Sequence, residues 1–494
     1  MKRTITLLSV LILMEGGLAM GNSQTLRQVR TYMPYSVPID PVKMVTIPDM
    51  NLSYALAGTL VEWDKHKEIS SAVASHWEVI DGKIYRFHIR SGLKWSDGSR
   101  VVSSQVKASF DRALKKYPAD LRSLGNLLVE IRCPSDEAID FVLNVKASEA
   151  NILGKLTEPN YGILKVNGAG DLDLSVTTGP FYISKQSTNE VTLARNTNWI
   201  KANTDMPEEV IIRRPGGDDF SSESILIKDP WANMIETSSM INADVVAQYE
   251  KGHFQIWKRP LDKMGLFQMG HTRANPTGFG LFRYLRKTMK KENLFRGLSG
   301  FETTDQAFPR GYQLHDSKFK CDDSEVKLPD EYKSRPVKLV LSPARISKAL
   351  QANIEAEIER VTGIKPAVTS IPLQDVGKVK KFGDYDIYAG TMGMADPDPE
   401  GIMSYYFEGE TPLVPRSSEN FVARLDQARK EQNKDKRTQA MTAIMTDATC
   451  KGHLLPLYHV STVGIGRPEL DFSGVPLTDE SITLSKIRFK TGAK

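Results

Sequence analysis

The sequence predicts an α/β protein with two or three domains, and three observations support this fold class. The chain has 494 residues, which is enough for two or three apolar cores of ordinary size. Residues 75–79 and 84–90 alternate between apolar and polar side chains, as paired β-strands do. Residues 347–361 instead carry apolar side chains at helical spacing, and Gly363 follows them as a helix-ending residue.

The segment 56–113 contains the densest local signals in the chain. Asp81 and Gly82 separate the two alternating segments and predict a tight hairpin turn, because both residue types tolerate a positive φ. Ser103 is expected to cap the helix that follows the second strand. Upstream, the apolar residues 58–61 are expected to lead through a turn into a helix before the first strand.

The order of these signals resembles the family 5 extracellular solute-binding proteins, the periplasmic oligopeptide- and dipeptide-binding proteins that supply ABC importers. The resemblance rests on aromatic, apolar, glycine and polar positions, which are Ala74, Trp77, Val79, Tyr85, Phe87, Arg90, Gly92, Trp95, Asp97, Gly98, Val106, Ser109, Phe110, Arg112 and Ala113. A second matching element runs from Gly179-Pro180 to Trp199. Looser matches extend over most of the remaining chain.

The resemblance implies a two-lobed periplasmic binding protein fold of type II, with mixed sheets and an extra subdomain in the first lobe. The predicted segments, in chain order, are a signal peptide at 1–19, the start of lobe 1 at 20–44, the extra subdomain at 45–168, further lobe 1 at 169–265, lobe 2 at 266–454 and a return to lobe 1 at 455–494. The chain would therefore cross between the lobes twice.

The first 19 residues have the composition of a cleavable secretory signal peptide. Lys2 and Arg3 supply the positive start, residues 5–14 the apolar core and residues 17–19 the small residues before the cleavage site. No cysteine follows this core, which argues against a lipoprotein, and no later segment is apolar for long enough to cross a bilayer. The sequence predicts a periplasmic protein.

Charge and cysteine content restrict the partners and cofactors that we expect. The formal net charge of +5 does not indicate nucleic acid, and the basic clusters at 286–291 and 429–437 are expected on solvated helix faces. Cys133, Cys321 and Cys450 allow at most one disulfide within a monomer, and the sequence does not choose the pair. Their spacing does not match a zinc site, and no metal or cofactor is predicted.

The second lobe is expected to alternate strands and helices. Residues 265–271 predict a strand, and residues 285–298 a helix that matches the family only loosely. A buried strand at 384–388 is expected to precede a loop at 390–400. Residues 418–449 are expected to be mostly helical.

The loop after the buried strand resembles the ligand-binding segment of the family. Asp396 and Asp398 match its Asp-Pro-Asp sequence. The preceding family aspartate, which pairs with the α-ammonium group of a peptide, falls at Gly393, and the family tryptophan falls at Gly390 or Thr391. Either aspartate could replace the lost carboxylate, since a buried ammonium group without such a partner is costly. Alternatively, both could shape a proline-rich turn.

Three aromatic residues are further candidates for solute contact. Trp95, Phe267 and Tyr405 occupy places where the family presents aromatic or strand residues near the ligand. Each could instead be a core residue.

The resemblance implies a monomeric protein that captures a peptide or a similar-sized solute by hinge closure. It would then deliver the solute to an ABC transporter permease in the inner membrane. Such a protein needs no catalytic residue, because the ligand itself stabilises the closed state. A sensor or scaffold that no longer feeds a transporter is an alternative, given the missing aspartate and tryptophan.

A serine acyl-transfer enzyme is a third interpretation. Ser324 and Lys327 have the spacing of a nucleophile and its base. Pro329 would break the helix that must hold both on one face, which disfavours this interpretation.

Overall fold

The computed structural model describes most of the chain from residue 24 to residue 490. The described ranges are 24–29, 39–42, 47–64, 68–116, 122–146, 152–213, 226, 230–237, 243–298, 301–309, 312–343, 345–372, 375–376, 379, 383–393, 399–408, 412–415, 420–431, 433–475 and 483–490. The predicted signal peptide at 1–19 lies outside them. Within these ranges, no helix is long and apolar enough to cross a membrane.

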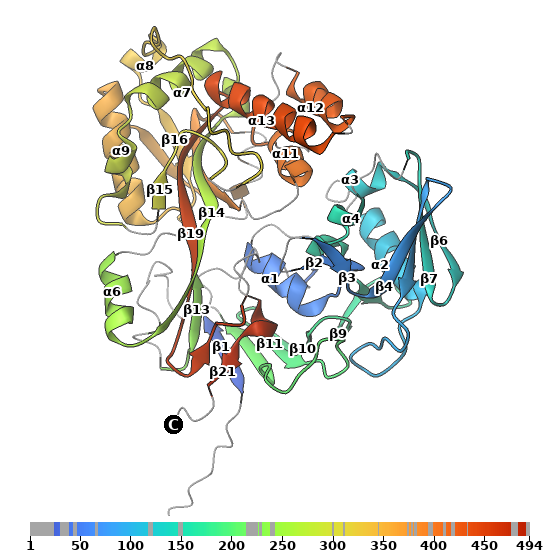
Figure 1. Ribbon diagram of the computed structural model, residues 1–494. Helices are drawn as coiled ribbons and strands as arrows, with labels where there is room; N and C mark the ends of the chain where they lie inside the picture. The colour runs from blue at the N-terminus through green and yellow to red at the C-terminus, as the bar shows by residue number, and fades with distance from the viewer. Residues whose placement is uncertain are drawn as a thin grey trace, which may run out of the picture.

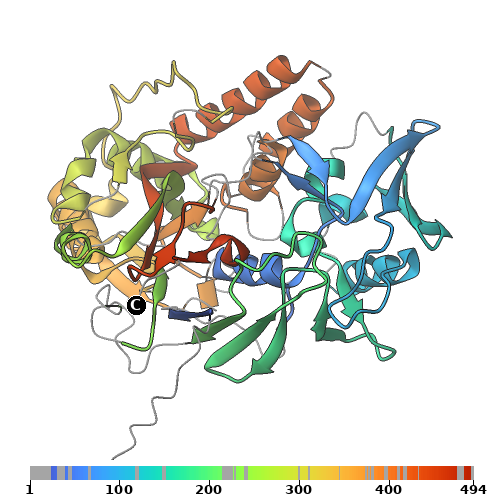
Figure 2. The same cartoon turned by 60° about the horizontal axis from the view of Figure 1, so that its bottom comes forward.

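The chain forms three units, which lie at the bottom, the right and the upper left of Figure 1. The bottom unit contains β1 (Thr25–Val29), α1 (Ile47–Leu56), β10 (Phe181–Gln186), β11 (Glu190–Arg195), β12 (Glu209–Arg213), β13 (Met234–Thr237), α6 (Ala243–Lys251), β20 (Leu470–Asp471), η6 (Leu484–Lys486) and β21 (Arg488–Phe489). Figure 2 shows this unit from below.

The right unit is a small α/β subdomain with its own apolar core. It contains β2 (Val61–Trp63), β3 (Ile69–Ser71), β4 (Ala74–Ile80), β5 (Ile84–Ile89), α2 (Ser103–Lys116), α3 (Arg122–Gly125), β6 (Leu128–Ser135), β7 (Ala138–Leu143), α4 (Ile152–Lys155), η2 (Pro159–Tyr161), β8 (Leu164–Val166) and β9 (Leu172–Thr177). Its main sheet has the strand order β4-β5-β7-β6.

The upper-left unit carries most of the remaining helices. It contains η3 (His271–Arg273), α7 (Pro276–Thr288), η4 (Lys291–Phe295), β15 (Phe301–Thr303), α8 (Glu331–Ser334), β16 (Lys338–Leu341), α9 (Lys348–Thr362), β17 (Ala367–Ser370), β18 (Ile387–Gly393), α11 (Pro399–Phe407), α12 (Phe421–Arg429) and α13 (Lys434–Cys450). One core packs its sheet against α7 and α9, and a second packs the opposite face against α11, α12 and α13.

Two long strands, β14 (Gln255–Met269) and β19 (Leu454–Gly466), join the bottom and upper-left units (Figure 1). They lie at the centre of an eleven-stranded mixed sheet with the order β10-β11-β12-β1-β13-β19-β14-β18-β16-β17, in which β15 pairs with β19. Their antiparallel pairing shifts register between Arg259 and Lys263 and again between Gly265 and Leu266. Pro260 lies in the first irregularity, as expected for a residue that cannot donate to the ladder.

Several predicted elements are confirmed. Asp81 and Gly82 have φ values of 49° and 66° in the turn between β4 and β5. Ser347 caps α9 by accepting a hydrogen bond from the amide of Leu350, and Gly363 ends this helix at φ 79°. Helices α12 and α13 occupy most of the segment that was expected to be helical.

Other predictions are wrong in type or boundary. A helix was expected after residues 58–61, but this part of the chain contains strands β2 and β3. The two strands pair with each other in antiparallel orientation. The helix expected at 285–298 is α7, which starts earlier because Asn275 caps it and Pro276 occupies its first turn. Strand β18 starts at Ile387 and extends to Gly393, because β14 pairs with all seven of its residues.

The residues that carry the family resemblance have structural roles in this fold. The side chain of Arg112 in α2 donates to Asp40 at 2.6 Å, so it ties the segment at residues 39–42, before α1, to the right unit. A Cβ atom on Gly179 would lie 2.5 Å from the backbone of Leu56, which explains the glycine. The side-chain amide of Asn196 donates to the carbonyl of Gly179 at 2.8 Å and closes the turn.

The expected solvated position of the basic cluster at 286–291 is wrong for two of its residues. Arg286 is buried and donates to Asp323 at 2.7 Å and to the carbonyl of Cys450 at 2.9 Å. Lys291 is also buried and donates to the carbonyl of Pro456 at 2.9 Å. Both cations replace lost hydration by hydrogen bonds to anions or carbonyl groups, as buried charges must.

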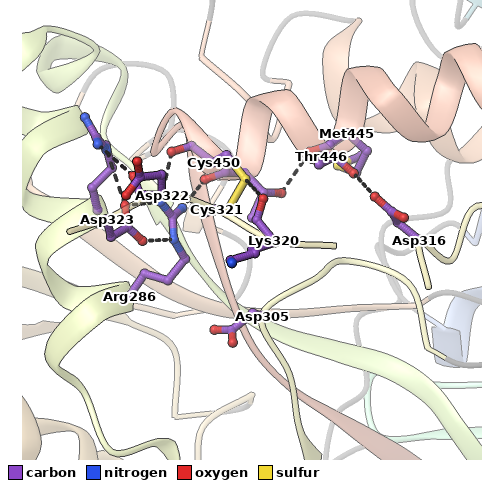
Figure 3. Close-up of a disulfide and its surroundings, with 12 residues drawn as sticks. Arg286, Asp305, Asp316, Lys320, Cys321, Asp322, Asp323, Met445, Thr446 and Cys450 are labelled. Atoms are coloured by element: carbon purple, nitrogen blue, oxygen red, sulfur yellow. Dashed lines mark hydrogen bonds and ion pairs between the residues drawn. A yellow bond between two sulfur atoms is a disulfide. The ribbon is translucent and has the colours of Figure 1, made fainter. Parts of the chain in front are cut away.

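A disulfide fixes the irregular segment before α8. Cys321 is bonded to Cys450, the last residue of α13, and Cys133 is a free thiol. Figure 3 shows that Arg286 and Asp323 lie beside this disulfide. The bond and the ion pair therefore attach the same segment to α13 and α7.

Candidate functional site

The candidate site lies where β14, β18 and β19 run side by side. Gly265 of β14 lies opposite Thr391 of β18 and opposite Tyr458 of β19, and Lys263 lies opposite Gly393. Strand β18 is parallel to β16, so both strands end at the same edge of the sheet. Ligands of open α/β sheets bind outside such carboxyl ends.

Two glycines at this edge lie beneath tyrosine rings. A Cβ atom on Gly265 would lie 1.9 Å from the ring of Tyr458, and a Cβ atom on Gly390 would lie 2.5 Å from the ring of Tyr388. No larger residue fits at either position. The two rings pack in different cores, Tyr458 with Phe267 beneath α7 and α9 and Tyr388 with Val340. Gly390, where the family tryptophan was aligned, leaves this space to Tyr388.

Two cations accompany the tyrosines. Lys263 belongs to the central strand β14 and is only 2% exposed, which is unusual for a lysine. Arg345 lies in the segment between β16 and α9, and its guanidinium donates to the carbonyl of Thr391 at 3.0 Å. Burial raises the pKa of Tyr388, and the positive charge of Arg345 partly offsets this effect.

Two hydroxyl groups at this edge are buried without a partner among the described residues. The hydroxyl of Tyr458 belongs to a side chain of 1% exposure, and that of Ser342, directly after β16, to a residue of 0% exposure. Burial raises the pKa of Tyr458, so its hydroxyl remains a hydrogen-bond donor at neutral pH. Buried hydroxyl groups in proteins are normally satisfied by a partner.

The structure places the predicted site residues in different environments. Gly393 ends β18 at the candidate site. Phe267 is buried in the core beneath α7 and α9. Asp396 and Asp398 lie outside the described residues, so their part in solute binding stays a prediction.

Of the other two aromatic candidates, Trp95 lies apart from this edge, whereas Tyr405 is close enough to Tyr388 to raise the pKa of its hydroxyl. Trp95 is buried in the core of the right unit, where its indole nitrogen donates to Gln105 at 2.9 Å. Tyr405 lies on α11 and is 55% exposed. Solute contact by Trp95, Phe267 and Tyr405 also stays a prediction.

The sequence patterns do not single out Lys263, Arg345 or Tyr458 as site residues. Lys263 has a recognisable signal, because a lysine directly before an apolar strand segment is unusual for a buried position. Arg345 and Tyr458 carry no local signal. Their place near Thr391 and Gly265 depends on pairing between strands far apart in the sequence.

One electrostatic interaction crosses from the right unit to the upper-left unit. Burial raises the pKa of Glu408, which follows α11, but hydrogen bonds from Arg429 and the charge of Lys155 lower it below its usual value. Lys155 is the last residue of α4 and is buried. The two units therefore approach each other at α4 and α11.

The serine acyl-transfer geometry is not formed. Ser324 lies in a turn, and its hydroxyl donates to Asp322 at 2.7 Å instead of to a base. Among the side chains that the structure describes, no group of three metal-ligating residues converges.

Residues 68–216 match the sequence model of the bacterial extracellular solute-binding proteins, family 5. The periplasmic oligopeptide-binding protein OppA of Salmonella typhimurium is 34% identical over 96 residues, which cover 19% of this chain and 17% of OppA. The Escherichia coli "Probable D,D-dipeptide-binding periplasmic protein DdpA" is 21% identical over 414 residues, which cover 76% of each chain. This chain is therefore similar to family 5 of the extracellular solute-binding proteins over residues 68–216.

The fold of this chain agrees with solved structures. The periplasmic binding protein DppA of Helicobacter pylori, in complex with the peptide STSA, superimposes with a TM-score of 0.79 at 16% identity. The superposition covers 94% of this chain and 98% of DppA. The predicted two-lobed α/β fold is thereby confirmed. The match to OppA itself spans less than a fifth of the length of OppA.

Proposed function

We propose that this protein is a family 5 solute-binding protein and the solute-binding component of an ABC importer. It captures a peptide or a similar-sized solute between two lobes and delivers it to a permease in the inner membrane. The observation that carries this proposal is the strand pair β14–β19, which continues from the bottom unit into the upper-left unit. The similarity to OppA and DdpA supports it.

The strand pair supplies a hinge. Its two register irregularities lie between Arg259 and Leu266, and each interrupts the regular ladder that would stiffen the connection. Hinges are short segments that absorb a backbone change while the packed units move as bodies. The lobe boundaries that the sequence predicts, near residues 265 and 455, lie in the same two strands.

Closure brings the right unit toward the upper-left unit. The charge of Lys155 acts on Glu408 across this approach, so the contact stabilises a closed arrangement. A solute that touches both lobes adds its own contacts to the closed state and shifts the population toward it.

The ligand class follows from the relatives and from the site. OppA is named for oligopeptides, and the DppA structure contains a four-residue peptide. Gly393 lacks the carboxylate that would hold the ammonium group of a peptide in the usual way. A peptide must therefore find its charge partner elsewhere in the site, or the solute is of another kind.

The protein functions in the periplasm after removal of residues 1–19. The N-terminal composition and the periplasmic relatives support this location. Intact-mass measurement of the protein from a periplasmic extract tests the prediction. A mature protein that retains residues 1–19 would contradict it.

Native mass spectrometry of the purified protein, followed by denaturation to release bound solute, tests the proposed function. We expect a monomer that carries a peptide or a solute of similar size. The emptied protein should then gain thermal stability with the recovered solute, by about 2.7 kcal/mol at a concentration 100 times Kd. It should also become more compact in small-angle X-ray scattering.

A matched variant separates this function from the enzyme alternative. Ser324→Ala should bind the solute as the wild type does, and an acylating probe should not label Ser324. A protein that carries no solute and responds to none, but retains a protein partner, would favour the scaffold alternative.

A further inference from the structure

Two histidines face each other on the outer side of the right unit. His76 of β4 lies directly opposite His88 of β5, and their imidazole rings are stacked with 4.2 Å between centroids and 7° between planes. Tyr85 and Phe87 of β5 are buried in the core of this unit, so His88 lies on the opposite face of the sheet. Figure 1 shows β4, β6 and β7 of this sheet at the right, away from β14 and β19.

A serine hydroxyl fixes the tautomer of His76. The hydroxyl of Ser75 donates to the backbone carbonyl of His88 at 3.1 Å. This hydroxyl has one proton, so its oxygen accepts the hydrogen bond of 3.0 Å that joins it to Nδ1 of His76. The proton of the neutral His76 ring is therefore on Nδ1, and Nε2 keeps its lone pair.

A carboxylate fixes the tautomer of His88. Oε1 of Glu78 accepts a hydrogen bond of 3.1 Å from Nε2 of His88, since an ionised carboxylate can only accept. Nδ1 of the neutral His88 ring therefore keeps its lone pair. Among the described residues, neither this nitrogen nor Nε2 of His76 has a hydrogen-bond partner.

These hydrogen bonds are of the kind that metal-binding histidines make. A metal-binding imidazole normally donates its second nitrogen to a carboxylate or another oxygen, which orients the ring and fixes the tautomer. Both His76 and His88 have such a partner. Arg86, which lies opposite Glu78, donates to Asp140 at 2.7 Å, so its positive charge is compensated.

The spacing of the two histidines also fits one metal ion. Side chains directly opposite on antiparallel strands have Cβ atoms about 4.5–5.5 Å apart. Two imidazole nitrogens bound to one tetrahedral ion are about 3.4 Å apart, because each bond is about 2.0–2.1 Å long. The rings must turn from their stacked position so that both lone pairs point at the ion, and surface side chains change rotamer within nanoseconds.

We propose that His76 and His88 bind a divalent transition-metal ion that prefers imidazole ligands, with Cu²⁺ bound more tightly than Ni²⁺ or Zn²⁺. Water fills the remaining positions, since no group of three metal-ligating side chains converges among the described residues. Glu78 and Ser75 act as positioning residues that hold the two rings. The ion joins β4 to β5 on the outer face of the right unit, so its binding does not depend on the proposed function.

Calorimetry and electron paramagnetic resonance with copper chloride test the site on the untagged wild-type protein. We expect Cu²⁺ to bind with a spectrum that shows two imidazole nitrogens. Zn²⁺ and Ni²⁺ should bind more weakly, and Mg²⁺, which requires oxygen ligands, should not bind. Absence of Cu²⁺ binding, or a spectrum with fewer than two imidazole nitrogens, would overturn the proposal without any variant.

Variants locate the effect. His76→Asn and His88→Asn should each weaken Cu²⁺ binding at least about tenfold, and Glu78→Ala by about tenfold. His253→Asn is the matched control, because His253 is exposed outside the right unit and asparagine tolerates its positive φ of 59°. This variant should bind Cu²⁺ as the wild type does. Unchanged Cu²⁺ affinity in both His76→Asn and His88→Asn would overturn the assignment to this pair.

Discussion

Asp386 illustrates how single residues stabilise the second lobe. Its carboxylate accepts from Arg335 at 2.6 and 2.8 Å, from the Tyr332 hydroxyl at 2.9 Å and from the amide of Lys338 at 2.8 Å. Burial would raise the pKa of Asp386, but the hydrogen bonds from Arg335 and Lys338 lower it below its usual value. The folded state therefore favours the charged form.

Asp386→Asn should reduce the free energy of unfolding by about 3 kcal/mol, because it leaves Arg335 partly uncompensated at a buried site. Urea denaturation monitored by circular dichroism measures this loss. Asp384→Asn is the matched control, since Asp384 is exposed and pairs with Lys338 at the surface. We expect it to cost less than about 1 kcal/mol.

The effect of Asp386 should depend on pH with a defined sign. A carboxyl whose folded pKa is depressed stabilises the fold above its unfolded pKa, and the contribution is lost as pH falls through the folded pKa. The difference between wild type and Asp386→Asn should be constant above about pH 5 and shrink below about pH 3.9. A difference that grows on acidification would contradict this assignment.

At the scale of elements, the pairing of β14 with β19 depends on the absence of a side chain at Gly265. A methyl group there would overlap the ring of Tyr458. The same ring packs edge-on against Phe295, with 4.8 Å between the ring centroids. The ring cannot move away without loss of this packing.

Gly265→Ala should therefore reduce the free energy of unfolding by about 2 kcal/mol or more, as overpacking does. Gly168→Ala is the control, because a Cβ atom there meets no atom within 4 Å. Chemical denaturation of both variants checks the prediction. Equal stability of the two would show that Tyr458 repacks freely.

The disulfide connects two other elements, the segment before α8 and the end of α13 (Figure 3). The cysteines are 129 residues apart in sequence, so the bond restricts a long loop of the unfolded chain. Replacement of Cys321 and Cys450 by serine should cost about 2–4 kcal/mol. Cys133→Ser should not change the free energy of unfolding by this amount. Dithiothreitol should destabilise the wild type and leave the double variant unaffected.

At the scale of the whole molecule, Lys155 and Glu408 couple the right unit to the upper-left unit. Lys155→Gln should weaken solute binding by about two- to fivefold, which is the usual strength of a partly exposed charge pair. Calorimetry measures the affinity, and small-angle scattering should show a more open protein without solute.

Lys165→Gln provides the control for this coupling. Lys165 donates to Asp97 at 2.8 Å within the right unit, so its loss should not alter the relation between the lobes. Equal losses of affinity in the two variants would show that Lys155 acts on the fold of the right unit and not on closure.

The sequence by itself determined the features that depend on a few neighbouring residues. The turn at Asp81-Gly82, the cap at Ser347 and the helix end at Gly363 each follow from local backbone preferences. The resemblance to family 5 also followed from sequence, because the matching residues recur in order between residues 68 and 216.

The tertiary structure alone decided which distant segments meet. The disulfide partner of Cys321, the burial of Arg286 and the extension of β18 to Gly393 depend on contacts across more than 100 residues. The same holds for the arrangement of Lys263 and Tyr458 around the candidate site. Local sequence patterns do not predict these pairings, because many segments have the same local preferences and could pair with the same strand. Which side chains meet at the candidate site therefore depends on how the strands pair.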